Sequence, residues 1–396
     1  MPAPTPMPSA TAVPHPAKPA PVSRGEREMA ALLGGPPEIL GTLSERAPGV
    51  ARALTTAFDE VLGEPGLGRS PRELATVATL TALGGSPEEL RVHAAAAYRA
   101  GVDPDELAAL LHHLVPYTGL PRVLQAIRAI ADLLPAGYPE HQVDLGDHRT
   151  TVIDRPAHGT PGGPPLVLVH ALGLDRRMWR DTLAALPVDR RVIAYDLRGH
   201  GSASEAPLVR GLQHFADDLH TLLDRLGVPS AHLVGLSLGG AIAQVYALSR
   251  PERVGRLTLV ATVATPQPAF VERGAAAQVG GMAGVLPATM TRWFTPEALA
   301  VNGWPVRYAR DQVLRADPDT WAASWQALAQ VDTLPRLPQL RMPTRLITGE
   351  LDPSTPPRLM AQIAAEVPGG RLTVIDGGPH MLSLERAREL ATALAA

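Results

Sequence analysis

The chain has 396 residues, of which 45% are hydrophobic and 19% charged, and its formal net charge is -3. This length predicts two domains, and the near-neutral charge gives no reason to expect nucleic acid or an anionic membrane as a partner. The absence of cysteine excludes disulfides, thiolate nucleophiles, CxxC redox chemistry and thiolate zinc sites. A small-molecule partner is therefore expected.

The first residues of the chain are rich in proline and alanine. Residues 1–24 carry only Lys18 and Arg24 as charges and lack the unbroken apolar run of a secretory signal. We interpret them as a disordered tail. Because no apolar run approaches the roughly 20 residues that a membrane span needs, we expect no membrane partner and, by default, a cytoplasmic location.

Residues 25–135 are predicted to form an all-α helical bundle. Apolar residues recur at three- and four-residue spacing, as in the run from Leu107 to Leu114, and no stretch alternates. Helix starts are predicted where a capping residue precedes proline and an acid follows. These starts are Ser70-Pro71, Ser86-Pro87 and Asp103-Pro104.

From about residue 140 to 396, short β-rich runs alternate with helical stretches. The runs are PLVLVH (165–170), RVIAYD (191–196), AHLVGLS (231–237), RLTLVATV (256–263), TRLITGE (344–350) and RLTVID (371–376). Most are continuously apolar, which indicates parallel strands buried on both faces and predicts a doubly wound, mostly parallel sheet. The stretch of about 264–340 holds four tryptophans and helical patterning without strands, and it is predicted to be a helical cap.

A candidate nucleophile lies at the end of the third run. The sequence Gly235-Leu236-Ser237-Leu238-Gly239 follows an apolar strand and opens an Ala-rich helix, which is the strand-turn-helix context of the GxSxG motif. A serine hydroxyl is a poor nucleophile, so it must be held on a sharp turn beside a base, with little side-chain bulk around it. We therefore predict Ser237 as the nucleophile.

The partners of a nucleophilic serine are expected later in the chain. His380 follows the last run and is the expected base, and Asp352 follows the run before it and is the expected acid that orients the base. Asp376 is an alternative acid. The oxyanion needs two backbone N–H donors, which we expect from Leu238 and Leu172. No metal and no organic cofactor is implied.

These motifs identify the C-terminal region as an α/β-hydrolase, and residues 165–396 resemble the 3-oxoadipate enol-lactonases. The resemblance is carried by HALGLDRRMW (170–179), YDLRGHG (195–201), GLSLGGAIAQ (235–244), PERVGRLTLVAT (251–262), RWFTPEAL (292–299) and GELDPSTPP (349–357). RWFTPEAL is the most specific, because general hydrolases do not share it. The chain departs from the lactonases at His170, where Asn-Ser-Leu-Gly is usual, and this leaves the exact lactone open. Arg292, Trp293 and Trp304 are candidates for the cap side of the pocket, or for ordinary cap packing.

Residues 70–127 resemble a carboxymuconolactone decarboxylase domain. The matching points are Arg72-Glu73-Leu74, Glu89-Leu90 followed by His93, Gly101-Val102 before Glu106, and the stretch from His113 through Tyr117 to Pro121. A related peroxidase-reducing branch has CxxC ahead of that histidine, where this chain has Ser86 and Glu89, so the decarboxylase branch is favoured. The resemblance implies Glu73, His93 and His113 as site residues for general acid work. The structural alternative is a buried, hydrogen-bonded His93 in a domain that only oligomerises.

Together the two resemblances imply a bifunctional enzyme of aromatic compound catabolism, because in the protocatechuate (β-ketoadipate) pathway the decarboxylase's product is the lactonase's substrate. Decarboxylation of 4-carboxymuconolactone would be followed by serine-dependent hydrolysis of the enol-lactone. One alternative is an esterase or lactonase with another substrate, for example in natural-product biosynthesis, joined to a non-catalytic helical domain. Another is a ligand-binding or scaffolding protein in which neither site turns over. The helical family usually assembles as rings, so a homo-oligomer is expected.

Overall fold

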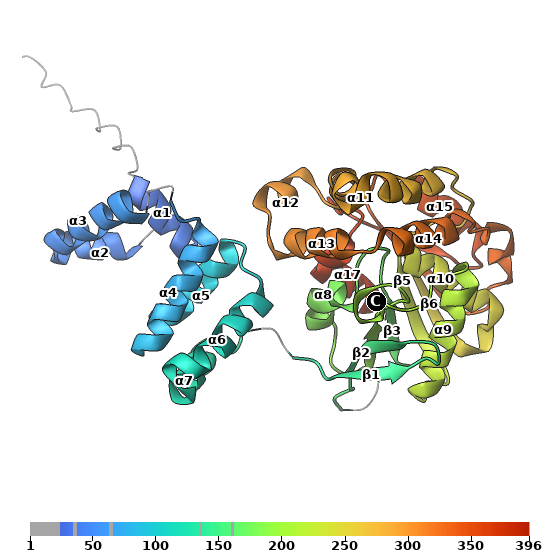
Figure 1. Cartoon of the computed structure of the whole chain (residues 1–396), viewed down its shortest axis with the longest axis horizontal. Helices are drawn as coiled ribbons and strands as arrows, with labels where there is room; N and C mark the ends of the chain where they lie inside the picture. The colour runs from blue at the N-terminus through green and yellow to red at the C-terminus, as the bar shows by residue number, and fades with distance from the viewer. Residues whose placement is uncertain (1–23, 35–37, 63–65, 135–136, 160–161, 396) are drawn as a thin grey trace, which may run out of the picture. The chain divides into compact units, whose positions relative to one another are not determined.

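The computed structural model describes residues 24–34, 38–62, 66–134, 137–159 and 162–395, so the tail predicted from the sequence falls outside the described residues up to position 23. The chain divides into two compact units (Figure 1). The helical unit is formed by the described residues of Met1–Ala100 together with Ala109–Leu133, and the sheet unit by Gly101–Ala108 together with those of Leu134–Ala396. The predicted fold class, an all-α region followed by a mostly parallel sheet with many helices, is confirmed.

The helical unit is built from amphipathic helices. They are α1 (Arg24–Leu33), α2 (Glu38–Arg46), α3 (Pro48–Ala57), α4 (Arg69–Leu83), α5 (Pro87–Arg99), α6 (Pro104–Thr118) and α7 (Leu120–Ile130), with a π-helical turn at Phe58–Leu62. The first residues of α6, up to Ala108, belong to the sheet unit. Helix α5 packs against α1, α4 and α7. The apolar faces of α4, α5 and α7 meet at Val77, Ala94 and Ile130, which are fully buried.

Helices start within one residue of all three predicted positions, but only two of the three predicted capping residues cap their helix. The Ser86 hydroxyl accepts the N–H of Glu89 at 3.1 Å at the start of α5, and the Asp103 carboxylate accepts the N–H of Asp105 at 2.8 Å at the start of α6. Ser70, in contrast, lies inside α4, which is preceded by Gly68 in extended conformation. The Ser70 hydroxyl donates instead to the carbonyl of Ala100, and this tertiary hydrogen bond outcompetes the local capping role.

The sheet unit contains an eight-stranded sheet in the order β1-β2-β4-β3-β5-β6-β7-β8. The strands are β1 (Glu140–Asp144), β2 (Arg149–Arg155), β3 (Leu166–Val169), β4 (Val192–Tyr195), β5 (Ala231–Leu236), β6 (Val254–Val260), β7 (Thr344–Gly349) and β8 (Arg371–Ile375). All six predicted runs are strands, and they pair in parallel. The antiparallel β1 and β2 were not predicted, because β1 is polar and mostly exposed and so lacks a continuous apolar run.

Helices cover both faces of this sheet. They are α8 (Arg180–Ala185), α9 (Leu212–Arg225), α10 (Leu238–Ser249), α15 (Pro357–Glu366), α16 (Leu382–Glu385) and α17 (Ala387–Ala395). Helix α8 packs with α17 on one side of the sheet, and α9 packs with α10 on the other (Figure 1). The strands between them are buried on both faces, as their continuous apolar runs predict.

Between β6 and β7 the chain forms the helices of the predicted cap. These are α11 (Ala269–Trp293), α12 (Pro296–Val301), α13 (Trp304–Arg315) and α14 (Pro318–Ala329). Helix α11 packs along α14, and its helical geometry is interrupted at Gly281, where φ is 67°. Trp293, Trp321 and Trp325 are buried there.

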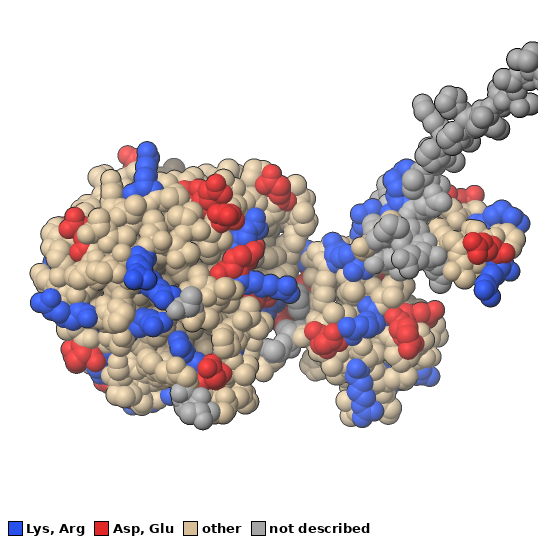
Figure 2. All heavy atoms as spheres, turned by 180° about the vertical axis from the view of Figure 1, so that it is seen from behind, with Lys and Arg blue, Asp and Glu red and all other residues tan. Residues whose placement is uncertain are grey.

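Two surface properties bear on the kind of partner. No helix among the described residues is long and apolar enough to cross a membrane. On the face that Figure 2 shows, acidic and basic side chains are interspersed over the described residues of both units. Proteins that bind nucleic acid usually carry a patch of basic side chains, and this face shows no such patch among the described residues.

Candidate active site

Ser237 lies on a strained turn between β5 and α10. Its φ of 56° falls in the left-handed region that residues other than glycine rarely adopt, which is typical of a nucleophile turn. A Cβ at Gly235 would lie 2.1 Å from the carbonyl oxygen of Gly239, and one at Gly239 would lie 2.2 Å from that of Val169. Both positions therefore need glycine for the chain to turn this sharply.

His380 and Asp352 reach Ser237 from the ends of two other parallel strands. Asp352 follows β7 and His380 follows β8, so both lie at the sheet edge where β5 ends. Nε2 of His380 lies 3.1 Å from Oγ of Ser237, and Nδ1 of His380 lies 2.8 Å from Oδ2 of Asp352. The three side chains form the hydrogen-bonded relay that nucleophilic catalysis by serine uses. The structure thus brings together the three residues singled out in the sequence, and their roles stay predictions.

The environment of Asp352 keeps its carboxylate ionised. Oδ1 accepts the N–H groups of Ser354 and Thr355 at 2.7 and 3.0 Å, and Oδ2 accepts the Thr355 hydroxyl at 2.5 Å. Burial acts to raise the pKa of Asp352, but the neighbouring His380 and these donors outweigh it and lower the pKa below its usual value. Sequence reasoning missed Thr355. The alternative acid, Asp376, is exposed, and the carboxylate beside His380 is that of Asp352.

The two predicted oxyanion donors flank the serine. Leu238 is the first residue of α10, so its N–H stands at a helix N-terminus without an intrahelical acceptor. Leu172 lines the same pocket as Ser237 and His380. The assignment of both N–H groups to an oxyanion hole stays a prediction.

His170 fixes the loop that carries Leu172. Its ring is fully buried, with Nε2 accepting the N–H of Leu197 at 2.8 Å and Nδ1 lying 2.8 Å from the carbonyl oxygen of Ala171. This pair of contacts requires a neutral imidazole with its proton on Nδ1. Burial lowers the pKa of His170 to about 4, which agrees with a neutral ring. His170 thus ties the loop to the residues after β4.

The pocket above Ser237 is small and has a mixed lining. About 420 Å³ of space not filled by atoms lies between its lining residues, part of it open to solvent. Half of the lining residues are apolar, among them Phe270, Trp293 and Trp325, and the cap also contributes Arg273 and Arg292. Two of the three cap candidates from the sequence, Arg292 and Trp293, line the pocket and Trp304 does not. Arg273 was missed.

A second pocket lies within the helical unit. Nδ1 of His93 on α5 lies 2.8 Å from Oε2 of Glu73 on α4, and the two side chains are 24% and 13% exposed. About 690 Å³ of empty space surrounds them, and Arg69, Arg72 and Arg99 also line it. A carboxylate-histidine pair beside three guanidinium groups can exchange a proton with a bound anion. Sequence reasoning found the pair and missed the arginines.

His113, the third residue singled out in the helical region, lies apart from that pair. It is exposed on α6, and its ring packs at 5.1 Å from that of Tyr117. It is not among the residues that line the pocket with Glu73 and His93. The structure therefore does not bring His113 together with the other two.

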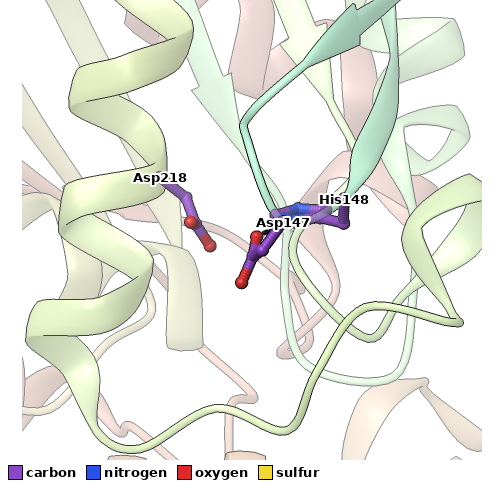
Figure 3. A group of neighbouring side chains, drawn as sticks. All are labelled: Asp147, His148 and Asp218. Atoms are coloured by element: carbon purple, nitrogen blue, oxygen red, sulfur yellow. Dashed lines mark hydrogen bonds and ion pairs between the residues drawn. The ribbon is translucent and has the colours of Figure 1, made fainter.

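Asp147, His148 and Asp218 are grouped closely enough to suggest a cation site (Figure 3). Asp147 and His148 lie on the turn between β1 and β2, and Asp218 points toward them from α9. The guanidinium of Arg198, however, donates to both carboxylates at 2.7 to 3.1 Å. Its hydrogen bonds hold the pKa of Asp147 well below the usual range. This buried arginine already supplies the positive charge, so the cluster is a structural ion-pair network.

Comparison with known proteins agrees with this geometry. A family model described as the alpha/beta hydrolase fold matches residues 164–387, and a model of the carboxymuconolactone decarboxylase family matches residues 48–132. The 3-oxoadipate enol-lactonase 1 of Acinetobacter baylyi is 28% identical over 217 residues, which are 54% of this chain and 81% of that protein. The putative carbamate hydrolase RutD of Pseudomonas savastanoi pv. phaseolicola is 32% identical over 226 residues, 55% of this chain and 86% of that protein.

A solved structure gives the same result. The crystal structure of the enol-lactonase from Burkholderia xenovorans superposes with a TM-score of 0.60 at 27% identity, over 64% of this chain and 98% of that one. The resemblance to a decarboxylase-like domain fused to an enol-lactonase-like hydrolase is thereby confirmed. Because the hydrolase match spans more than half of the chain, this protein is an enzyme of the α/β-hydrolase fold family that also carries a carboxymuconolactone decarboxylase-like domain.

Proposed function

We propose that this chain is a bifunctional enzyme that decarboxylates 4-carboxymuconolactone in the helical unit and hydrolyses the resulting 3-oxoadipate enol-lactone at Ser237. The observation that carries the proposal is the hydrogen-bonded series from Ser237 through His380 to Asp352, with contacts of 3.1 and 2.8 Å, in a pocket that Ser237 and His380 line. The similarity to enol-lactonases in the same region supports the choice of lactone.

The first half of the lactone hydrolysis opens the ring. Oγ of Ser237 attacks the lactone carbonyl carbon while Nε2 of His380 takes the hydroxyl proton, and Asp352 stabilises the imidazolium. The N–H groups of Leu172 and Leu238 hold the oxyanion. As the tetrahedral intermediate collapses, the ring C–O bond breaks. The leaving enol oxygen receives the proton from His380, and the enol tautomerises to the ketone.

The second half releases the product. His380 takes a proton from a water molecule, which attacks the acyl ester on Ser237 through the same oxyanion contacts. The C–O bond to Ser237 breaks, and the serine oxygen recovers its proton from His380. The product is 3-oxoadipate, with one carboxylate formed from the lactone carbonyl. Water is the only co-reactant, so this sequence balances without a cofactor.

For the helical unit we assign Glu73 and His93 to proton return. Loss of CO2 from the lactone acid leaves an electron pair delocalised as an extended enolate, which must be protonated on carbon. His93 is polarised by Glu73 at 2.8 Å and faces a pocket lined by arginines that can hold the carboxylate ends of the substrate. His113, exposed on α6, has no part in this assignment.

Self-association through the helical unit and a cytoplasmic location stay predictions. In support of self-association, Tyr117, Leu120 and Leu124 on α6 and α7 are 73%, 54% and 40% exposed. Apolar side chains grouped on a surface favour a protein interface, and we propose a second copy of this chain as the partner. Light scattering on the eluting protein tests it, with Leu120→Lys expected to shift the mass to that of the monomer.

The decisive experiment adds freshly generated 4-carboxymuconolactone to the purified chain and follows CO2 and 3-oxoadipate. Wild type is expected to give both products, while Ser237→Ala gives CO2 and stops at the enol-lactone. If the chain forms neither product, the substrate is wrong. The hydrolase assignment then requires that another ester be cleaved in a manner that depends on Ser237.

A second candidate function is hydrolysis of a different ester, lactone or carbamate, with a helical unit that does not catalyse. The 32% identity to a putative carbamate hydrolase favours it, as does His170 in place of the asparagine usual in lactonases. Turnover of aryl esters without any turnover of the enol-lactone would support this candidate. Failure of a serine-directed phosphonate to label Ser237 would instead point to a binding protein.

A further inference from the structure

The pocket above Ser237 holds two positive charges that no acidic group balances. Arg273 and Arg292, both on α11, line the same pocket as Ser237 and His380. Among the described residues, no carboxylate forms an ion pair with either one, and no acidic group contributes to the environment of either guanidinium. Partly buried charges in proteins are normally paired, so this pair requires an explanation.

Contacts with neutral groups hold both guanidinium groups in place. Arg273 stacks over the rings of Phe270 and Trp325, at 4.9 and 5.4 Å from their centroids. Arg292 donates to the Thr289 hydroxyl at 3.1 Å. Burial, with the nearby charge of Arg273, lowers the pKa of Arg292 to about 10, and burial also lowers the pKa of Arg273. Guanidinium groups in proteins nevertheless stay protonated at neutral pH. Each guanidinium group is therefore held in place by neutral contacts, and its positive charge can still pair with a bound anion.

The course of α11 explains how two distant positions meet at one pocket. Gly281 lies between Arg273 and Arg292 and interrupts the helix with a φ of 67°. A glycine is favoured there because this backbone conformation is costly for other residues. Ordinary cap packing does not need two like charges on the apolar wall of a pocket, since a leucine or methionine would fill the same space without the cost of burial.

We propose that Arg273 and Arg292 together bind one carboxylate of the substrate, so that the serine site selects lactones and esters whose acyl chain ends in a carboxylate. The inference rests on the proposed reaction at Ser237. Guanidinium groups bind carboxylates through paired N–H donors, and an anion between the two arginines relieves their mutual repulsion. A neutral substrate would leave both charges unbalanced. The carboxylate also sets the distance of the reacting carbonyl from Oγ of Ser237.

The test compares monophenyl adipate with phenyl hexanoate, which share a six-carbon acyl chain and differ in a terminal carboxylate or methyl group. Both esters are given to wild type, Arg273→Met and Arg292→Met in the full chain. Arg358→Met, at an exposed position on α15, is the matched control. Wild type and the control are expected to have a kcat/KM about 10- to 100-fold higher for the adipate than for the hexanoate. This ratio corresponds to the free energy that a hydrogen bond to a charged group contributes. Each pocket variant should lose most of that preference while it still hydrolyses the hexanoate.

A binding measurement separates this inference from the proposed reaction. Ser237→Ala, which should not turn over, is titrated calorimetrically with both esters, alone and combined with Arg292→Met. Selective binding of the adipate that disappears with Arg292→Met supports the subsite, even if wild type hydrolyses neither ester and the proposed reaction therefore fails. Equal binding of the two esters to Ser237→Ala, or a preference for the adipate that survives Arg292→Met, overturns the subsite while leaving the reaction at Ser237 intact.

Discussion

The hydroxyl of Thr355 donates to Oδ2 of Asp352 at 2.5 Å, and Nδ1 of His380 lies 2.8 Å from the same oxygen. One carboxylate oxygen of Asp352 is therefore within hydrogen-bond distance of both the His380 ring and the buried Thr355 hydroxyl. Thr355 is 3% exposed, so water cannot easily replace its hydrogen bond. The geometry gives Thr355 a positioning role for the acid, although it does not touch Ser237.

Replacing Thr355 with valine is expected to lower kcat/KM for ester hydrolysis about tenfold or more, because a hydrogen bond to a charged group contributes about 1.5 to 3 kcal/mol. The loss removes a donor that lowers the pKa of Asp352 and leaves the carboxylate less firmly oriented. Initial rates with an aryl ester measure the effect. Thr355→Ser keeps the hydroxyl and should recover most of the rate. An unchanged rate in Thr355→Val would show that the backbone donors alone orient Asp352.

In the helical unit, Glu73→Gln and His93→Gln are each expected to lower CO2 release from 4-carboxymuconolactone by about 100-fold or more, the usual scale of general acid catalysis. Each substitution breaks the contact of 2.8 Å between a carboxylate and an imidazole. Hydrolysis of aryl esters at Ser237 should be unchanged, since these residues belong to the other unit.

His113→Gln is the matched control for this experiment. Because His113 is exposed and packs only on the Tyr117 ring among the described aromatic contacts, its substitution should leave CO2 release near the wild-type rate. A loss as large as that in His93→Gln would place His113 in the site, for example through a second copy of the chain, and would contradict the assignment made here.

The sequence could predict those parts of the fold and site that local chemistry determines. The six parallel strands stand out as β-rich runs, although β8, at the sheet edge, is mostly exposed and not buried on both faces as expected. Ser237 stands out because the turn that carries it tolerates almost nothing but glycine at positions 235 and 239. His380 and Asp352 could be found because parallel strands deliver their ends to one edge. The strands and the three site residues can therefore be recognised from the order and spacing of residues along the chain.

The remainder depends on tertiary contacts that leave no periodic signal. Thr355 is one of several hydroxyls in a loop, and Arg273 meets Arg292 only because α11 is interrupted between them. Strand β1 is polar because it lies at the sheet edge and is mostly exposed. The capping role expected of Ser70 was lost to a hydrogen bond with Ala100, a residue distant in sequence. Each of these could be read only from the folded chain.

Gly239→Ala is expected to lower the thermal midpoint of the sheet unit and to abolish ester hydrolysis. The added Cβ would lie 2.2 Å from the carbonyl oxygen of Val169, in the central strand β3, which cannot shift without disturbing the sheet. Overpacking of a core typically costs about 1 to 3 kcal/mol, and here the obstacle is backbone. Gly284→Ala is the control, because a Cβ there meets no atom within 4 Å. Equal midpoints for the two variants would contradict the prediction.

The stability of the sheet unit is expected to fall as the pH decreases from about 7 to 5, because it buries neutral histidines. Burial lowers the pKa of His170 and of His200 to about 4, and burial with nearby arginines lowers that of His232 to about 3. Between these values and the ordinary value of 6.5, the unfolded chain binds more protons than the folded one, so the free energy of unfolding decreases with decreasing pH. The stabilisation that these neutral histidines provide is present in full above pH 6.5, the ordinary pKa of histidine. It is lost as the pH falls toward the lower pKa that each histidine has in the folded chain.

His232→Gln tests this pH dependence, because it is neutral at every pH and a glutamine can still hydrogen-bond to Thr258, which lies 2.8 Å from Nε2 of His232. Its free energy of unfolding should fall by about 2 kcal/mol less than that of wild type between pH 7 and pH 5. Tryptophan fluorescence during urea unfolding measures it, and all five tryptophans lie in the sheet unit, so the helical unit contributes no signal. If the two proteins lose stability equally over this range, His232 has the same pKa in the folded and unfolded chain, and its surroundings must differ from those described.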